Sequence, residues 1–312
     1  MLQSIISRAR TALWSGADDG THQSSAANAK YIFPTVDPEI DGPDCNRDCT
    51  DCTLRYPSNF KVDQRRSLYR SAKGFGTHVL VATGKSDWVP RVENEKGSLM
   101  EAFKKMSYKS KKGRIMVSAS NISPKKDDDN AGATDATTVL VLPAFTFVDR
   151  VTAADIPEFV ERYVDGSEAN NDNNDNAATD GRTRRLVSRP CTRDYIILLC
   201  SHRSRDARCG ISAPIIKTEL ERHLRTHNLL RDSDDSRPGG ASIYFVSHVG
   251  GHTFAANVLV YRREAQQMIW LARIRPEHCE GIVKYTVLQG KVVCPEERLR
   301  GGADWREGVM SW

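Results

Sequence analysis

The sequence lacks the features that would assign it directly to several common classes of protein. No apolar run approaches the roughly 20 residues that a membrane-spanning helix needs, so we expect no membrane span. Its 45 basic and 40 acidic residues leave a net charge of only +5, with no basic stripe interleaved with aromatics, so we expect no nucleic-acid binding. It also has no catalytic triad, phosphate loop or nucleotide fingerprint, which argues against an enzyme.

A secretory signal is also lacking, and this bears on the eight cysteines. In a chain of 312 residues without such a signal, unevenly placed cysteines argue against a disulfide scaffold. Residues 1–14 are apolar and contain two arginines and no acid, as in a mitochondrial presequence. Because Asp18 and Asp19 follow at once, we expect a short amphipathic or irregular leader instead.

Two pairs of metal-binding side chains are the most informative feature that is present. Cys200 follows a predicted strand at 195–199 and precedes Cys209 by an eight-residue spacer. His248 follows a predicted strand at 243–247 and begins the sequence His-Val-Gly-Gly-His252. An amphipathic helix lies between the two strands, so they should be parallel, with both pairs at the carboxyl edge of the sheet.

Two thiolates and two imidazoles can hold either zinc or an iron–sulfur cluster. Neither the eight-residue cysteine spacer nor the distant histidine pair matches a zinc finger. Replacing two thiolates by neutral imidazoles removes negative charge, so an iron–sulfur cluster with this ligand set should have a raised reduction potential. The second nitrogen of each imidazole can carry a proton, which would couple electron uptake to proton uptake.

The sequences around these ligands closely resemble the sucrase/ferredoxin-like family. The matching strings are Cys200-Ser-His, Arg-Asp-Ala-Arg-Cys209-Gly-Ile, His248-Val-Gly-Gly-His252-Thr-Phe-Ala-Ala-Asn257-Val and Trp270-Leu-Ala-Arg. The resemblance is dense from about Asp194 to Tyr285 and thinner upstream. It implies a thioredoxin-like ferredoxin domain with one [2Fe–2S] cluster, in which both cysteines bind one iron and both histidines bind the other.

The rest of the chain is organised around a degenerate repeat. The elements expected before the linker have the same order as those expected after residue 195. They are strands at 78–82, 114–118, 138–142 and 145–148, a helix at 98–105 and a helix after a capping box at 152–155. We therefore predict an α/β fold with two tandem thioredoxin-like domains. The first lacks Cys or His where its strands end, at Thr83 and Ala119. The predicted parts are an irregular segment (1–60), a domain without metal (61–165), a flexible linker (166–189), a thioredoxin-like [2Fe–2S] ferredoxin domain (190–300) and a C-terminal tail (301–312).

Several residues near the predicted ligands allow two interpretations. Gly250 and Gly251 disfavour a helix and indicate a tight loop, which either brings backbone N–H groups to the cluster or is a plain turn. The arginines of the cysteine loop either steer an acidic partner or form a solvated surface; they are Arg203, Arg205 and Arg208. His202 either supports the site or, as we expect, lies on the surface.

A second group of residues has metal-like spacing further from the main motif. Cys45, Cys49 and Cys52 lie close in the sequence, but three thiols do not fill a tetrahedral site unless a histidine joins them. His223 and His227 are spaced i,i+4 on the predicted helix. We expect unliganded cysteines and a polar helix face.

The chain ends in Met310-Ser311-Trp312, which resembles the terminal tripeptide by which the targeting complex of the assembly machinery recognises some cytosolic iron–sulfur proteins. It favours a cytoplasmic location over a mitochondrial one. We predict an electron carrier that accepts electrons from a redox partner protein such as a flavoprotein reductase. The alternatives are a zinc-stabilised thioredoxin-fold interaction module and a cluster-based redox or iron sensor.

Overall fold

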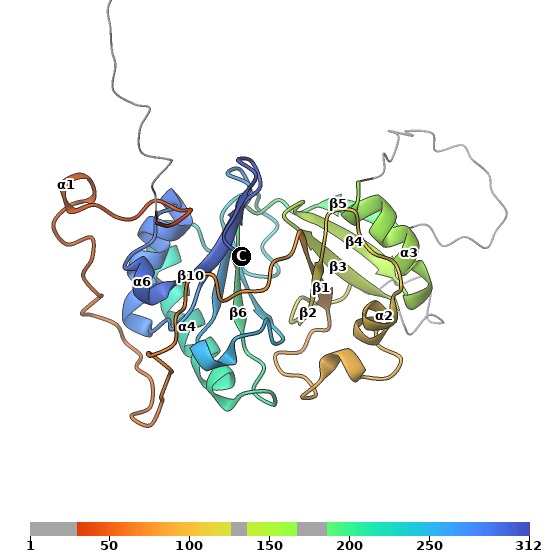
Figure 1. The fold of residues 1–312 in the computed structure, drawn as a ribbon, viewed down its shortest axis with the longest axis horizontal. Helices are drawn as coiled ribbons and strands as arrows, with labels where there is room; N and C mark the ends of the chain where they lie inside the picture. The colour runs from red at the N-terminus through yellow and green to blue at the C-terminus, as the bar shows by residue number, and fades with distance from the viewer. Residues whose placement is uncertain (1–29, 126–135, 167–185) are drawn as a thin grey trace, which may run out of the picture. The chain divides into compact units, whose positions relative to one another are not determined.

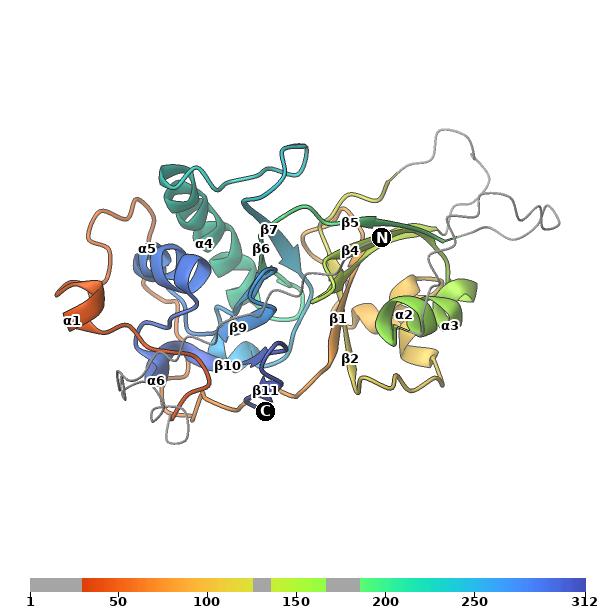
Figure 2. The same ribbon diagram turned by 90° about the horizontal axis from the view of Figure 1, so that it is seen from above.

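A computed structural model describes residues 30–125, 136–166 and 186–312 of the chain. Residues 31–312 form one compact unit. Its described strands make one mixed sheet in the order β11-β10-β9-β8-β6-β7-β2-β1-β3-β4-β5 (Figures 1 and 2). The sheet has two halves, which meet where Ser120 of β2 pairs with Val246 of β7.

The upstream half contains the strands and helices expected from the sequence, together with η2 and β5, which were not expected. They are β1 (Thr77–Ala82), η2 (Val92–Asn94), α2 (Leu99–Lys105), β2 (Ile115–Ser120), β3 (Thr137–Leu142), β4 (Thr146–Val151), η3 (Ala153–Asp155), α3 (Ile156–Phe159), η4 (Val160–Val164) and β5 (Val187–Pro190). Strand β1 pairs with β2 in parallel and with β3 antiparallel, and β3 pairs antiparallel with β4. The predicted capping box is confirmed at the start of η3, where the Thr152 backbone N–H donates to Asp155 Oδ2 (2.9 Å).

The downstream half repeats this pairing. Its elements are β6 (Tyr195–Cys200), α4 (Ala207–Thr226), β7 (Ala241–Val246), η5 (His252–Phe254), β8 (Val258–Arg262), β9 (Gln267–Leu271), η6 (Pro276–His278), α5 (Cys279–Gly281), η7 (Ile282–Val287), α6 (Pro295–Arg298), β10 (Leu299–Asp304) and β11 (Val309–Met310). Strand β6 is parallel to β7 and antiparallel to β8, as β1 is to β2 and β3. The α/β class and the repeated order of elements are therefore confirmed, whereas the division into two tandem domains stays a prediction.

Alternate residues of the central strands face two different cores. Val79 packs with Phe103 in a core beneath α2 and α3, which cover one face of the upstream half (Figure 2). Leu80 points to the opposite face and belongs to one cluster with Leu198 and Trp270 of the downstream half. Because side chains alternate along a strand, a strand buried on both faces loses the polar alternation of a surface strand. The two halves therefore share a core as well as a sheet.

Two predicted boundaries differ from the structure. Strand β5 begins at Val187, inside the predicted linker, and pairs with β4 as an exposed edge strand. Strand β10 crosses residue 301, where we expected a tail, and pairs with β9. Both segments are poor in the apolar alternation that marks a strand, because β5 is an exposed edge and β10 contains Gly301 and Gly302. The greater part of the predicted linker (167–185), residues 126–135 and the leader lie outside the described residues.

The irregular segment before β1 lies against the downstream half. Its helix α1 (Pro38–Asp41) has only four residues. Polar contacts fasten the segment: Cys49 N–H donates to Glu277 O (2.9 Å), and Tyr56 Oη donates to Ile274 O (2.8 Å). Apart from α1 and an isolated β-bridge at Thr35, the described residues 30–60 contain no helix or strand. Among the helices in the described residues, none is long and apolar enough to cross a membrane.

Candidate metal centre

The two cysteines of the main motif come together at the carboxyl end of β6. Cys200 is the last residue of this strand, and Cys209 lies in the first turn of α4, where Asp206 caps the helix by accepting from Arg208 N–H (3.0 Å). Their exposed fractions are 2% and 0%. A hydrogen bond from Cys209 lowers the pKa of Cys200, and the same bond raises the pKa of Cys209. Both thiols are therefore buried at the same place, and each affects the titration of the other.

The two histidines lie at the end of the neighbouring strand. His248 is the second residue after β7 and His252 begins η5, and their ring centroids are 5.1 Å apart. The Nδ1 atoms of both rings are buried and have no hydrogen-bond partner. Burial and the nearby His248 lower the pKa of His252, which favours its neutral form. Since a buried polar atom without a partner is costly, these two nitrogens point to a ligand that they would bind.

The two pairs lie at the same edge of the sheet because β6 and β7 are parallel. Cys200 pairs with Val246 in the register of the two strands, so both ligand-bearing turns leave the same edge of the sheet. Besides Cys209, the nearby His248 contributes to the lowered pKa of Cys200. The predicted parallel pairing of the two strands is confirmed by this register, whereas the assignment of the four side chains as ligands stays a prediction.

A buried arginine holds the backbone of the histidine loop. Arg300 is 3% exposed, and its Nη1 donates to Gly250 O (2.8 Å) and to Asn257 Oδ1 (3.0 Å). Gly251 is left-handed (φ 68°, ψ 39°), and a Cβ there would lie 2.4 Å from the Arg300 guanidinium. A glycine is therefore required at residue 251 both by the backbone conformation and by the closeness of this side chain.

Two residues quoted for the family resemblance complete this support. Trp270 Nε1 donates to Asn257 Oδ1 (3.0 Å), and Asn257 Nδ2 donates to Gly251 O (3.2 Å). The Arg300 guanidinium lies over the Trp270 ring, 4.4 Å from its centroid. The sequence analysis missed Arg300, which lies 48 residues after His252 and outside the matching strings, so no local pattern marked it.

The expectation that His202 lies on the surface is wrong. Its side chain is 1% exposed, because it fills the space between the two halves. Its Nδ1 accepts from the His248 backbone N–H (3.2 Å), and its Nε2 donates to Val89 O (3.0 Å). His202 therefore supports the histidine loop. The arginines of the cysteine loop behave differently: Arg203 and Arg205 are exposed, and Arg208 forms a two-pronged ion pair with Asp206.

The upstream half contacts the site through the strand ends that lack metal-binding residues. Ala119, at the end of β2, exchanges hydrogen bonds with Ser247: Ser247 N–H donates to Ala119 O (2.8 Å), and Ala119 N–H donates to Ser247 Oγ (3.0 Å). Ser201 Oγ donates to Ser86 O (2.6 Å). The upstream half therefore makes hydrogen bonds to both turns that carry the candidate ligands.

The remaining cysteines and histidines of interest do not form one group. Cys45 is 2% exposed and packs with Val36, Tyr285 and Val293, away from the other two thiols of its motif. His227 caps the C-terminus of α4 and is exposed, so it does not pair with the buried His223. Cys49, Cys52 and His223 do lie together, as described below.

Comparisons with known proteins agree with the motif. The model of the sucrase/ferredoxin-like family matches residues 68–301. Actin patches distal protein 1 of Saccharomyces cerevisiae is 30% identical over 264 residues, covering 78% of this chain and 79% of the relative. Altered inheritance of mitochondria protein 32 of Clavispora lusitaniae is 29% identical over 266 residues, covering 81% and 90%. Neither name states an enzymatic activity. No solved structure matches the chain.

Proposed function

The chain belongs to the sucrase/ferredoxin-like family, and we propose that it is an electron-transfer protein whose Cys200, Cys209, His248 and His252 hold one [2Fe–2S] cluster. The observation that carries the proposal is the pair of buried, partnerless Nδ1 atoms beside a pair of buried thiols at one sheet edge. Soft thiolates and neutral imidazoles are the ligand set of Rieske-type clusters.

The spacing of the ligand atoms favours two metal ions over one. Within the part of the chain that the structure describes, no three of these four side chains bring their ligand atoms within 4.8 Å of one another. A single zinc ion would need all four ligand atoms around one point, at about 2.0–2.3 Å from the metal. A pair of cysteines and a separate pair of histidines suits a binuclear cluster, with one pair for each iron.

When bound, the cluster would accept and donate single electrons at a potential above that of an all-cysteine cluster. The chain contributes the environment of this chemistry. Cys209 lies in the first turn of the 20-residue helix α4, whose N-terminus stabilises negative charge. Arg300 adds a buried positive charge beside the histidine loop. The ring nitrogens of His248 and His252 that do not bind metal would hold the protons that accompany electron uptake.

The partners of this function follow from the same proposal. We infer that a redox partner protein such as a flavoprotein reductase supplies the electrons and that the protein acts in the cytoplasm. Delivery of the cluster would use Met310-Ser311-Trp312. Met310 is 40% exposed, whereas Ser311 is buried and the Trp312 ring stacks on Phe75 with centroids 5.1 Å apart. Capture of this tripeptide would therefore require its last two residues to leave their packing.

The test is the visible spectrum of the purified protein, with iron and sulfide analysis. We expect a coloured protein with two irons and two sulfides, and loss of both in Cys200→Ser and Cys209→Ser. Cys191→Ser is the matched control, because Cys191 is equally buried and lies before β6. A colourless protein with one zinc ion, lost in the same two variants, would instead support the zinc-stabilised interaction module. A sensor would retain the cluster but transfer no electrons to a partner.

A histidine series tests the second half of the ligand set. His248→Cys and His252→Cys can keep a cluster, because a thiolate replaces the imidazole. The added negative charge should lower the reduction potential, which protein-film voltammetry measures. An unchanged or higher potential in both variants would contradict histidine ligation.

A further inference from the structure

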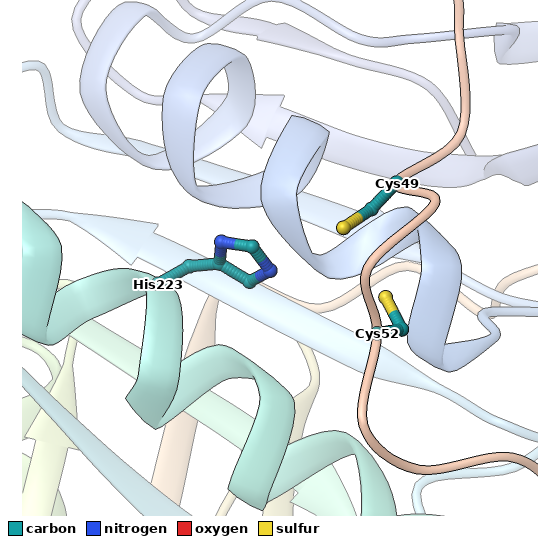
Figure 3. Close-up of side chains that lie close together, drawn as sticks. All are labelled: Cys49, Cys52 and His223. Carbon is teal, nitrogen blue, oxygen red and sulfur yellow. The ribbon is translucent and has the colours of Figure 1, made fainter.

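We propose that Cys49, Cys52 and His223 form a second metal site, which binds one zinc ion and fastens the irregular segment before β1 to helix α4. The two Sγ atoms and a ring nitrogen of His223 all lie within 4.8 Å of one another. Figure 3 shows the three side chains pointing toward a common space, the cysteines from the segment and the histidine from the helix. Neither cysteine is in a disulfide bond.

The neighbouring Arg222 marks the place of a cation. Its Nη2 lies 3.6 Å from Cys49 Sγ, 4.0 Å from Cys52 Sγ and 3.0 Å from His223 Nε2. Because a guanidinium only donates, His223 Nε2 must be the acceptor, so its lone pair points into the space between the sulfurs. One positively charged nitrogen therefore occupies the point on which all three ligand atoms converge.

Arg222 has other partners that would remain if a metal took this place. Its Nε donates to Glu219 Oε2 (2.9 Å), and its Nη1 lies 3.6 Å from Asp51 Oδ2. A metal ion would displace the end of the side chain while its ion pair with the buried Glu219 stays. The carboxylates of Asp51 and Glu280 lie within 4.8 Å of Cys49 Sγ and offer the fourth ligand.

The ligand set identifies the metal class. Two thiolates, one imidazole and one oxygen in a tetrahedral arrangement suit Zn²⁺, which is borderline-soft and has no geometric demand of its own. Binding would release one proton from each thiol to solvent. The two thiolates balance the charge of the ion, and Arg222 balances the carboxylate.

A metal at this site would also attach the irregular segment before β1 to the downstream half. The segment around Cys49 has little regular structure, and polar contacts fasten it to the downstream half: Glu219 Oε1 accepts from Thr53 N–H (3.0 Å), Thr53 Oγ1 (2.6 Å) and Leu54 N–H (3.0 Å). A metal bound by both the segment and α4 would add a strong link there. Cys209 and His223 are 14 positions apart in α4, about 21 Å along its axis, so this site is independent of the proposed cluster.

The experiment is metal analysis of the full-length protein, purified without added chelator and dialysed. We expect about one zinc per chain, and X-ray absorption at the zinc edge should show two sulfur neighbours at about 2.3 Å and one nitrogen at about 2.0–2.1 Å. Cys49→Ser, Cys52→Ser and His223→Asn should each reduce the zinc content at least about tenfold and leave iron unchanged. Cys45→Ser and His227→Asn are the controls and should keep the zinc.

Three results would overturn the proposal. One is a wild-type chain that holds no zinc after incubation with Zn²⁺ and dialysis. Another is a Cys49–Cys52 disulfide in the mass of the intact protein. The third is zinc that persists in all three ligand variants or disappears equally in the controls. Zinc bound at the main motif would be lost in Cys200→Ser and kept in Cys49→Ser, whereas zinc bound at the second site would show the opposite pattern. Failure of this proposal is therefore distinguishable from failure of the cluster assignment.

Discussion

Adding one methyl group at Gly251 or at Gly250 tests how the histidine loop is held. Both glycines have positive φ angles, 68° and 88°. An alanine at either position should cost roughly 1–2 kcal/mol, because left-handed backbone is unfavourable for a residue with a Cβ. At Gly250 the added Cβ would meet nothing within 4 Å, whereas at Gly251 it would lie 2.4 Å from the guanidinium of Arg300.

The clash at Gly251 is expensive because Arg300 is buried and hydrogen bonds hold its guanidinium in place. Its Nη1 donates to Gly250 O and Asn257 Oδ1, and its Nε donates to Ser71 Oγ (3.2 Å). Loss of one hydrogen bond of this charged group costs about 1.5–3 kcal/mol. We therefore expect Gly251→Ala to destabilise the fold by roughly 2.5–5 kcal/mol in total, against roughly 1–2 kcal/mol for Gly250→Ala.

The assay is urea unfolding of metal-stripped protein, followed by circular dichroism, so that metal loss does not enter the equilibrium. Iron content after purification is a second readout. Gly251→Ala should lose iron because the loop that carries both histidines shifts, and Gly250→Ala should retain it. Equal destabilisation by the two variants would refute the role assigned to Arg300, as would a normal iron content in Gly251→Ala.

Three further predictions concern protons and cluster delivery. Burial, aided by the nearby Arg114, lowers the pKa of His78 to about 3, so the folded protein keeps it neutral while the unfolded chain takes up a proton below about pH 6.5. The free energy of unfolding should therefore fall on acidification from pH 6.5 toward 3, and protonation of His78 should account for about 1.4 kcal/mol of this loss at pH 5.5. In urea titrations, the free energy of unfolding of His78→Gln should fall by about 1.4 kcal/mol less than that of the wild type between pH 7.5 and 5.5. An unchanged pH dependence would show that His78 is not buried in the neutral form. If His248 and His252 bind iron, the reduction potential should fall as pH rises, because ferric iron makes the bound imidazoles more acidic. The apparent pKa values would then belong to the pair of histidines. A potential that does not change with pH in protein-film voltammetry would remove proton coupling from the mechanism. Met310→Asp changes an exposed residue of the terminal tripeptide. It should reduce cluster loading in cells but not in chemically reconstituted protein. Equal loading of the variant and the wild type in cells would mean that the tripeptide match is accidental.

The recurrence of strands and helices could be predicted because its signals are local. The apolar runs around Val79 and Ile197 and the capping box at Thr152 report directly on the conformation of their own segments. The ends of the repeats could not be predicted in this way. Residues 301–304 form a strand because β9 offers a partner edge, although glycines at 301 and 302 weaken the local preference for a strand.

The supporting residues of the candidate site show the same limit. His202 was expected at the surface because it lies in a polar loop, and only the upstream half, through Trp88 O and Val89 O, makes its position buried. Arg300 reaches the histidine loop across the sheet. No spacing rule predicts such contacts, because they join residues far apart in the chain.

By itself the sequence determined the family, the α/β class and the four candidate ligands, because these depend on motifs and on side-chain periodicity within short segments. The tertiary structure decided which residues support those ligands and which cysteines meet a histidine. Cys45 and Cys49 are neighbours in the sequence, yet one packs in a small apolar core and the other faces His223, 174 residues later. The physical reason is that a metal site depends on where several segments converge, and that convergence is set by the packing of the whole sheet.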